Sequence, residues 1–340
     1  MSTDSIRTLF HPFERDLLAA PAPGTRTLFL GAQPGFLLPE GWSGDLVCVQ
    51  PLKPLVTVLE RERRTVSPTL PFEDFDGALI LLDRHRGQGE RRMVDALRRV
   101  KPGGGIVVGG SNSEGAASFA RRAATLLPVE QRLSKHHGTV FWLRRPDDPS
   151  AAIAAYESAS ATETVDGRFE TAPGMFSHGR IDAGSMLLAG SLPDDLSGSV
   201  ADFGAGWGYL AVTVLERCPS VADVALYEAH WNALEAARRN VTPVAGDRRL
   251  SFHWTDLASG PPATTYDAIV MNPPFHTGGA ATPALGETFI KVAAKALKAR
   301  GRLWVVANTG LPYEKVLGAV LPSWKEVARA DGFKVLEARR

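Results

Sequence analysis

The chain has 340 residues, 44% hydrophobic and 22% charged, which is enough for two domains with full cores. Two cysteines exclude a disulfide-dense scaffold, and the absence of a long apolar run excludes a membrane-spanning class. A net charge of +1 gives no evidence for or against a nucleic-acid partner. The start of the chain, polar and acidic from Met1 to Arg7, lacks a basic-then-apolar export signal, and the cysteines lack metal-ligand spacing. We therefore expect a metal-free, cytoplasmic protein that is a monomer.

The first half of the chain alternates apolar strands with glycine turns and a helix. A strand at 27–30 runs into the glycine turn 31–35, and further strands are predicted at 46–49 and 75–82. A helix over 90–100 then leads through a glycine-rich segment into another apolar strand. This order is typical of a doubly wound α/β sheet.

The segment from Arg84 to Lys101 is the most basic part of the chain. Residues 1–150 hold 20 Lys and Arg against 17 Asp and Glu, whereas residues 151–340 hold 18 against 20. Apolar residues recur in the segment at helical spacing, so we expect its arginines on the opposite, solvated face. That face is either an ordinary solvated surface or a contact for RNA phosphates. The candidates for RNA contact are Arg91, Arg92, Arg98 and Arg99.

A polar stretch of small residues separates the two halves. Residues 146–150 and 157–162 have the composition of a linker. We therefore expect one domain over 1–160 and a second over 161–340.

A second glycine turn opens the central part of the second half. The strand 200–203 is followed by Gly204, Gly206 and Gly208, and a helix continues to Glu216. Glycines let a ligand approach the backbone, and the helix start supplies free N–H groups. Enzymes that bind dinucleotides use a similar turn, so the turn alone does not identify the ligand.

Carboxylates follow the next two strands of this half. Glu228 ends the strand 224–227, where it would meet a ribose diol, and Asp256 follows the strand 250–254, within reach of an adenine amino group. Each acidic residue alone is more simply a helix cap or a surface charge. Because ligands of open α/β sheets collect at the carboxyl ends of the strands, the carboxylates together favour a nucleotide-like ligand.

The next strand, 268–271, ends in Asn272-Pro273-Pro274-Phe275, a motif suited to methylation of a planar amine. Such an amine is a poor nucleophile because its lone pair is delocalised into the adjoining π system. If Asn272 Oδ1 and the Pro273 carbonyl accept its two N–H bonds, the lone pair is turned toward a methyl donor, and Phe275 can stack on the ring. The alternative is a turn that merely closes a strand.

Four ordered motifs resemble those of class I S-adenosylmethionine-dependent methyltransferases, namely Asp202-Phe203-Gly204-Ala205-Gly206-Trp207-Gly208, Glu228, Asp256 and Asn272-Pro273-Pro274-Phe275. Within this class, the chain most resembles the ribosomal RNA guanine-N2 methyltransferases of the RsmC type. The segments that carry this narrower resemblance are His276-Thr277-Gly278-Gly279, Pro173 to Ser177 and Asp182 to Ser185. The strong resemblance covers about residues 173–340, and in the first half it is one of architecture.

The resemblance implies a role for each motif. Gly204 and Gly206 would line the methionine part of S-adenosylmethionine, and a segment containing Phe176 would fold over it. The implied cofactor-binding residues are Phe176, Asp182, Ser185, Asp202, Gly204, Ala205, Gly206, Glu228, Ala229, Asp256, Leu257 and Asn272. The implied catalytic residues are Asn272, Pro273, Pro274 and Phe275, and Phe275 and His276 would also contact the substrate.

The resemblance also implies the fold, which is α/β with two tandem Rossmann-like methyltransferase domains. A helix near 287–297, a strand at 302–306 and a hairpin over 324–338 would complete a mostly parallel, seven-stranded sheet with a terminal antiparallel hairpin in the second domain. The first domain has Gln33-Pro34 in its glycine turn and Leu81-Leu82-Asp83-Arg84 after its strand. We therefore expect a degenerate copy without a cofactor, with a structural or RNA-positioning role.

The leading function is methyl transfer to guanine N2 in ribosomal RNA, most simply of the small subunit (16S). The same motifs also serve other planar amines, such as a large-subunit guanine, adenine N6 or a protein glutamine amide. A nucleotide-binding module without catalysis and an NAD(P)-dependent oxidoreductase are the alternatives from other classes. A hydride-transfer residue set is missing from the sequence, and an oxidoreductase would leave the Asn272 motif unexplained.

Overall fold

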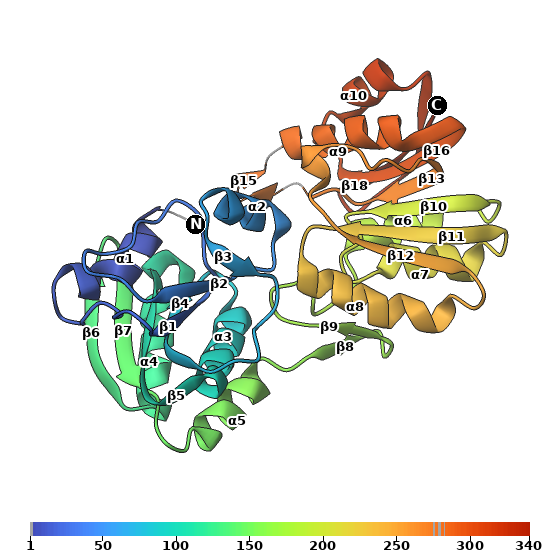
Figure 1. Cartoon of the computed structure of the whole chain (residues 1–340). Helices are drawn as coiled ribbons and strands as arrows, with labels where there is room; N and C mark the ends of the chain where they lie inside the picture. The colour runs from blue at the N-terminus through green and yellow to red at the C-terminus, as the bar shows by residue number, and fades with distance from the viewer. Residues whose placement is uncertain (1–2, 275, 278–279, 282) are drawn as a thin grey trace. The chain divides into compact units, whose positions relative to one another are not determined.

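The computed structural model describes residues 3–274, 276–277, 280–281 and 283–340. Contacts divide the chain into two compact units, Met1–Thr162 and Glu163–Arg340, drawn from blue to green and from green to red in Figure 1. Among the described helices, none has both the length and the apolar character that crossing a membrane requires.

The first unit contains a seven-stranded sheet in the order β3-β2-β1-β4-β5-β7-β6. The first five of these strands are parallel to their neighbours, whereas β7 is antiparallel to both β5 and β6. The strands are β1 (Arg26–Leu30), β2 (Asp45–Val49), β3 (Thr65–Ser67), β4 (Phe75–Leu81), β5 (Val100–Ser111), β6 (Val129–Lys135) and β7 (Gly138–Arg144). The helices are α1 (Thr3–Glu14), α2 (Lys53–Arg61), α3 (Arg86–Arg99), the 3-10 turn η1 (Asn112–Glu114), α4 (Ala116–Leu126) and α5 (Ser150–Ala159).

The second unit repeats this topology with the order β12-β11-β10-β13-β16-β18-β17. Its strands are β10 (Gly198–Phe203), β11 (Val221–Glu228), β12 (Arg249–Trp254), β13 (Tyr266–Met271), β16 (Leu297–Asn308), β17 (Ser323–Ala330) and β18 (Phe333–Arg339). Its helices are α6 (Ala183–Ser191), α7 (Tyr209–Arg217), α8 (Trp231–Val241), η2 (Thr242–Val244), η3 (Leu257–Ser259), α9 (Pro283–Ala296) and α10 (Tyr313–Val320). Two small hairpins, β8 (Glu163–Val165) with β9 (Phe169–Thr171) and β14 (His276–Thr277) with β15 (Ala280–Ala281), lie outside the main sheet. The predicted tandem sheets and the terminal antiparallel hairpin are confirmed.

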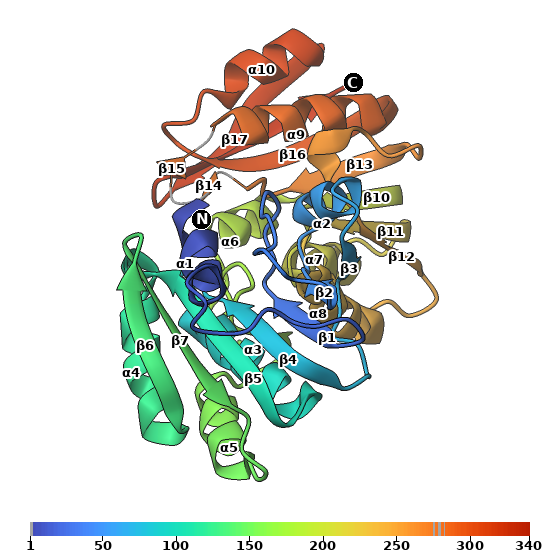
Figure 2. The ribbon, with the colours of Figure 1, turned by 60° about the vertical axis from the view of Figure 1, so that its left-hand side comes forward.

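Helices cover both faces of each sheet, as expected for strands that are apolar on both sides. In the first unit, α1 packs on one face, whereas α3, α4 and α5 share a buried cluster with the other face (Figure 2). In the second unit, α6, α7 and α8 pack on one face and α9 and α10 on the other. Both units are therefore three-layered, and each has its own core.

The prediction of a linker between the two halves is wrong over part of its length. Residues 150–159 form α5, which packs on α3 and buries Ala152 and Tyr156 in the first core. The Tyr156 ring stacks on Phe119 with the ring centroids 6.0 Å apart. Ala152 and Tyr156, between the two linker-like stretches, lie four residues apart on one buried face, and the helix they anchor extends into both stretches, over residue 150 and residues 157–159.

Matching hydrogen bonds at the carboxyl end of the first strand relate the two units residue by residue. Gly31 N donates to Val49 O at 3.0 Å, and Gly204 N donates to Tyr227 O at 2.9 Å. In each unit, the residue before this glycine ends the strand and pairs in parallel with both neighbouring strands. Positions of the first unit can therefore be assigned to positions of the second by register.

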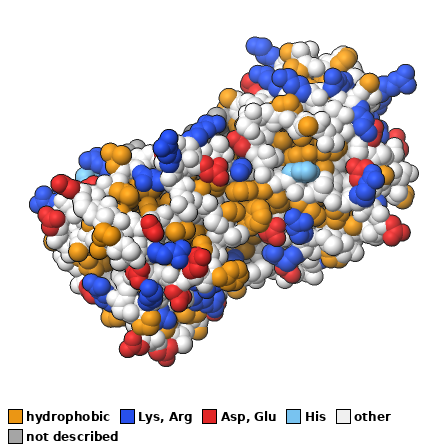
Figure 3. Space-filling view, viewed as in Figure 1, with side chains coloured by type: hydrophobic (Ala, Val, Ile, Leu, Met, Phe, Trp, Pro, Cys, Tyr) orange, Lys and Arg blue, Asp and Glu red, His pale blue; other side chains and the backbone are white. Residues whose placement is uncertain are grey.

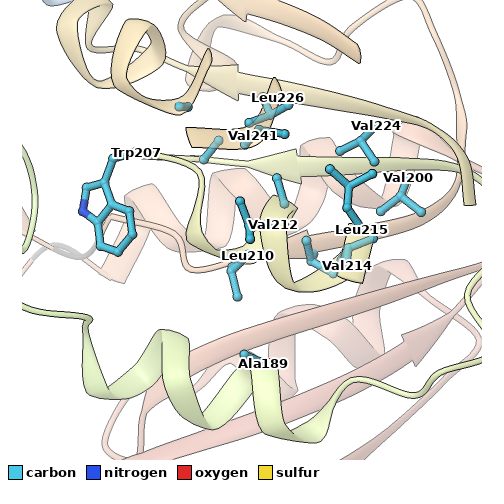
Figure 4. Close-up of a cluster of buried hydrophobic side chains, with 14 of the residues drawn as sticks. Ala189, Val200, Trp207, Leu210, Val212, Val214, Leu215, Val224, Leu226 and Val241 are labelled. Carbon is cyan, nitrogen blue, oxygen red and sulfur yellow. The ribbon is translucent and has the colours of Figure 1, made fainter. Parts of the chain in front are cut away.

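The core beneath the second glycine turn fixes the helix that follows it. Figure 4 shows side chains of β10, β11, α7 and α8 directed toward one another, with Trp207 at the edge of this cluster. Gly208, at the start of α7, has a left-handed φ of 91°. A Cβ at this position would lie 2.7 Å from Val241 Cγ2 and 3.2 Å from Ala237 Cα, so the turn needs a glycine on two grounds.

Gly208→Ala is expected to lower the free energy of unfolding by about 1–3 kcal/mol, since it adds both backbone strain and a steric clash. Gly246→Ala is the matched control, because Gly246 also has a positive φ of 59°, but a Cβ there would meet no described atom within 4 Å. Denaturant unfolding followed by tryptophan fluorescence compares the two variants. Equal losses of stability would show that the contact with α8 does not constrain the turn.

Candidate functional site

The glycine turn between β10 and α7 presents bare backbone at the carboxyl end of the sheet. Gly204 and Gly206 have left-handed φ angles of 78° and 54°. Within the described part of the chain, a Cβ at Gly206 would meet nothing within 4 Å, so the glycine leaves space beside the backbone. The N–H groups of Gly204 and Ala205 both donate to Tyr227 O, at 2.9 and 3.0 Å, which ties the turn to β11.

Glu228, at the end of β11, holds this turn with its carboxylate. One oxygen accepts from Gly206 N and the other from His230 N, both at 2.8 Å. Burial raises the pKa of the Glu228 carboxyl, although the N–H bonds of His230 and Gly206 act in the opposite direction. The carboxylate is therefore fixed beside the glycine turn, where the sequence predicts a ribose contact.

Asp256 follows β12, the neighbour of β11 in the sheet. Its Oδ1 accepts from Ala258 N at 2.9 Å and caps η3, and Leu257 beside it is buried. Ala229 O accepts from Trp254 Nε1 at 2.8 Å, which joins the ends of the two strands. The two carboxylates thus follow adjacent parallel strands at the same edge of the sheet.

Asn272, directly after β13, has an amide whose orientation is determined by its neighbours. Its Nδ2 donates to Asp182 Oδ2 at 2.9 Å and to Ser185 Oγ at 2.8 Å. Because an ionised carboxylate only accepts hydrogen bonds, the amide nitrogen must face Asp182. Among the described residues, Asn272 Oδ1 accepts no hydrogen bond, so it is left to accept from another donor. Asp182 also caps α6 by accepting from Ser185 N at 2.8 Å.

One cleft brings together seven of the twelve predicted cofactor-binding residues, whereas Asp202, Glu228, Ala229, Asp256 and Leu257 are not among its lining residues. Phe176, Asp182, Ser185, Asn272 and the turn 204–206 all line it. Four further lining residues were not predicted from the sequence, and the two aromatic ones among them could have been suspected from their place in or after the glycine turn. These four residues are Ser177, Trp207, Tyr209 and Leu210.

Trp207 shows how the cleft keeps its shape. Its Nε1 donates to Phe176 O at 3.0 Å, and its ring lies 5.1 Å from that of Phe169. The indole therefore links the glycine turn to the segment preceding α6. The Phe176 side chain itself is 57% exposed, as expected for a residue at the mouth of a cleft.

Asp202 lies behind the turn and does not line the cleft. It is fully buried in β10, and its Oδ2 accepts from Ala211 N of α7 at 3.1 Å. Burial raises its pKa to about 8. In the described part of the chain, its Oδ1 has no hydrogen-bond partner. The structure thus supports a role for Asp202 in holding α7 against the turn.

The remaining residues of the Asn272 motif are partly described. Pro273 is buried and Pro274 is exposed, and the backbone of His276 pairs with Ala281 in the small hairpin. Phe275 lies outside the described residues. No group of three or more His, Cys, Asp or Glu residues in the described ranges is arranged to hold a metal ion.

The prediction of a solvated arginine face on α3 is wrong for Arg92. Its side chain is 12% exposed, pairs with Asp83 at 2.9 Å and donates to Leu81 O at 2.6 Å. The helix turns this residue toward the glycine turn of the first unit, where its guanidinium packs on Gly31. Arg92 is therefore a structural residue and is not available to RNA.

The other three arginines remain at the surface. Arg98 pairs with Glu157 at 2.5 Å with its side chain 52% exposed, and Arg99 donates to Phe72 O at 3.0 Å. Arg91 is exposed. On the face shown in Figure 3, Lys and Arg side chains of this unit are interspersed with Asp and Glu. A continuous basic stripe is therefore not visible in this view.

At positions that correspond to predicted cofactor and catalytic residues of the second unit, the first unit has side chains of different chemistry. By register, Gln50 takes the place of Glu228, donates from Nε2 to Ala32 O at 2.7 Å and accepts from Leu52 N at 3.0 Å, so both ends of its amide are used. Arg92 packs on Gly31 as Phe289 faces Gly204 in the second unit. The places of Gly206, Asp256 and Asn272 are taken by Gln33, Leu70 and Leu81.

Known proteins resemble the chain in both sequence and fold. The proteins named ribosomal RNA small subunit methyltransferase C from Vibrio vulnificus (strain CMCP6) and Pseudomonas putida (strain W619) are each 29% identical, over 272 and 276 residues. The matches cover 78% of both chains in the first case, and 80% of this chain and 81% of the relative in the second. The solved structure of the T. thermophilus 16S rRNA N2 G1207 methyltransferase (RsmC), in complex with AdoMet and guanosine, matches with a TM-score of 0.76 at 22% identity. It covers 99% of this chain and 93% of its own, so the fold of both units is shared.

A family model described as the methyltransferase small domain matches residues 166–337, which is nearly all of the second unit and half of the chain. This range includes the glycine turn, Glu228, Asp256 and the Asn272 motif. The resemblance predicted from these motifs is confirmed: the chain belongs to the methyltransferase small domain family.

Proposed function

We propose that the protein transfers a methyl group from S-adenosylmethionine to the N2 amine of a guanine in small-subunit (16S) ribosomal RNA. The observation that carries this proposal is the fixed amide of Asn272, whose nitrogen is held by Asp182 and Ser185 so that Oδ1 is left to accept from a substrate amine. The names of the relatives support the choice of small-subunit RNA, and that of the solved structure supports guanine N2.

The cleft has the features that the cofactor needs. S-adenosylmethionine supplies an electrophilic methyl group on a sulfonium when it is bound. The open backbone at Gly206 and the free space beside it suit the methionine part, and Glu228 is placed for the ribose hydroxyls. Asp256 is proposed to meet the adenine amine, since it follows the neighbouring strand. Phe176 and Ser185 are proposed to close the cleft from the side of α6.

Catalysis is proposed to consist mainly of orientation. Asn272 Oδ1 and the Pro273 carbonyl would accept the two N–H bonds of the guanine amine and turn its lone pair toward the methyl group. The two prolines restrict φ and keep these acceptors in place. Phe275 and His276 remain the proposed contacts to the base and its RNA. The proton that leaves the methylated amine is acidic enough that no strong general base is required.

The first unit is proposed to position the RNA, to support the second unit structurally, or both. It has lost the cofactor-binding residues, and its buried amide and arginine fill the corresponding places. Arg91, Arg98 and Arg99 remain candidates for phosphate contact. The proposed domain boundary lies near residue 160, between α5 and β8.

Methylation of 16S RNA is tested directly by mass spectrometry of nucleosides. RNA or small subunits from a strain that lacks the protein are incubated with the purified chain and S-adenosylmethionine. We expect N2-methylguanosine at one position. Methylated adenosine, or methylation only of large-subunit RNA, would point to one of the other planar amines. A lack of transfer to any nucleic acid, combined with transfer to a glutamine amide, would overturn the RNA assignment.

Asn272→Ala is expected to reduce kcat by about a hundredfold or more, comparable to the loss of one positioned transition-state contact. Cofactor affinity should change much less, because the amide is proposed to hold the substrate amine. Single-turnover methylation and calorimetry with S-adenosylhomocysteine separate the two effects. Asn232→Ala is the control for loss of an amide, since Asn232 is exposed on α8 and does not line the cleft. A wild-type rate in Asn272→Ala would rule out the proposed role.

Glu228→Gln is expected to weaken S-adenosylhomocysteine binding by about 1–3 kcal/mol, because an amide has one acceptor oxygen and cannot accept from both Gly206 N and His230 N while it also meets the ribose. Glu235→Gln is the matched control, because Glu235 pairs with Arg238 on α8 and does not line the cleft, and it should bind as the wild type does. Calorimetry on the full chain should also find one bound cofactor per chain. A second equivalent would mean that the first unit had kept a site, contrary to the proposal.

A further inference from the structure

The first unit has a cavity of its own where β4 and β5 end. Three arginines line it, Arg84 after β4, Arg86 at the start of α3 and Arg122 on α4, together with Asp83 and Glu114. We call it the arginine cavity. Counted along the sequence from the matched strand ends Ile80 and Met271, Arg84 corresponds to Phe275, so the cavity is lined by the segment of the first unit that corresponds to the Asn272 motif.

A buried carboxylate organises two of these arginines. Glu90 is 1% exposed, and its Oε1 lies 3.1 Å from Arg86 Nε and 3.2 Å from Arg122 Nε. A carboxylate this deeply buried is stable only when it is paired, so Glu90 holds both guanidinium groups at the cavity. The Arg86 side chain is still 67% exposed and that of Arg122 is 31% exposed.

The terminal nitrogens of these arginines are largely uncommitted. Within the described residues, the hydrogen bonds of Arg84 and Arg86 involve only Nε, to His85 and Glu90. Arg122 uses one terminal nitrogen, which donates to Ala155 O at 3.3 Å. A guanidinium whose Nε edge is fixed and whose terminal N–H groups are free is well suited to bind a phosphate.

Of the carboxylates at the cavity, Asp83 and Glu90 are paired with arginines, whereas Glu114 has no ion pair among the described residues. Asp83 pairs with Arg92 at 2.9 Å, and Glu90 is shared by Arg86 and Arg122. Burial raises the pKa of Glu114, with Asp83 adding to the shift, so the uncharged form of this carboxyl is favoured more than in water. In addition, the cavity includes Gly115, which begins α4 without a side-chain cap, and helix N-termini favour anions.

We propose that the arginine cavity binds a backbone phosphate of the RNA that the second unit methylates. The proposal rests on the proposed function for the identity of the RNA. It assigns RNA contact to Arg84 and Arg86, which belong to the basic segment 84–101 but were not among its named candidates, and to Arg122, which lies outside that segment. The place of the lost target-base site would thereby have become a phosphate site.

The test compares Arg84→Gln/Arg86→Gln with Arg121→Gln in the full chain. The double variant leaves Glu90 paired with Arg122, so the fold should be retained, which circular dichroism and S-adenosylhomocysteine binding check. Arg121 is the matched control, because it is exposed on the same helix as Arg122 but does not line the cavity. The probe is a fluorescently labelled fragment of 16S RNA, measured by anisotropy across a salt series.

We expect the double variant to bind RNA about tenfold more weakly, with the slope of log affinity against log salt smaller by about 0.7–0.9, the value for one released phosphate contact. The KM for RNA should rise while kcat and cofactor affinity stay constant. If the double variant still methylates 16S RNA and shows the same RNA affinity and salt slope as Arg121→Gln, the phosphate-binding role of the arginine cavity is overturned, whereas the proposed function is not. A wild-type protein that binds RNA through these arginines but never methylates guanine would overturn the proposed function alone.

Discussion

The contact between Asn272 and Asp182 is the interaction on which the second unit's site depends. The two residues are separated by ninety positions in the chain and belong to different layers, one at the end of a central strand and the other at the start of a covering helix. Their hydrogen bond fixes the side-chain amide in one of its two orientations and also closes the cleft between the strand ends and α6. The same carboxylate caps that helix, so the amide, the helix and the cleft wall are positioned together.

The two units show how one fold can keep its architecture while its chemistry changes. Both sheets have the same strand order and the same backbone bonds at the first glycine, because these follow from packing and topology. The side chains at the strand ends differ between the units. In the first unit the Gln50 amide donates to the backbone of Ala32, whereas in the second unit Asn272 Oδ1 accepts no hydrogen bond from the described residues.

Much of the fold could be predicted because its strands and turns depend on short-range sequence patterns. Apolar strands, glycine turns and the motif at Asn272 each occupy a few consecutive residues, and parallel strands must bring their carboxyl ends to one edge. The predictions that were wrong concern residues whose structure depends on contacts between distant parts of the sequence. Arg92 has the helical position of a surface residue, but Gly31 leaves room for its guanidinium and Asp83 supplies the charge. Likewise, only the packing against α3 distinguishes α5 from a polar linker.

The hydrogen bond between Asn272 and Asp182 could not have been predicted from spacing, because the two residues are ninety positions apart and only the capping role of an Asp has a local signature. Trp207, by contrast, lies inside the glycine turn and could have been suspected as a wall of the cleft.

The separate contacts of Gln50 and Arg92 in the first unit restrict which substitutions it tolerates. Changing Gln50 to Glu would place a carboxylate oxygen where Nε2 now donates to Ala32 O, so two acceptors would face each other in a buried site. Replacing Arg92 with a shorter side chain would leave the Asp83 carboxylate without the guanidinium that it pairs with. Each of these single substitutions is therefore destabilising on its own, so the side-chain arrangement of the second unit could enter the first only through several changes made together.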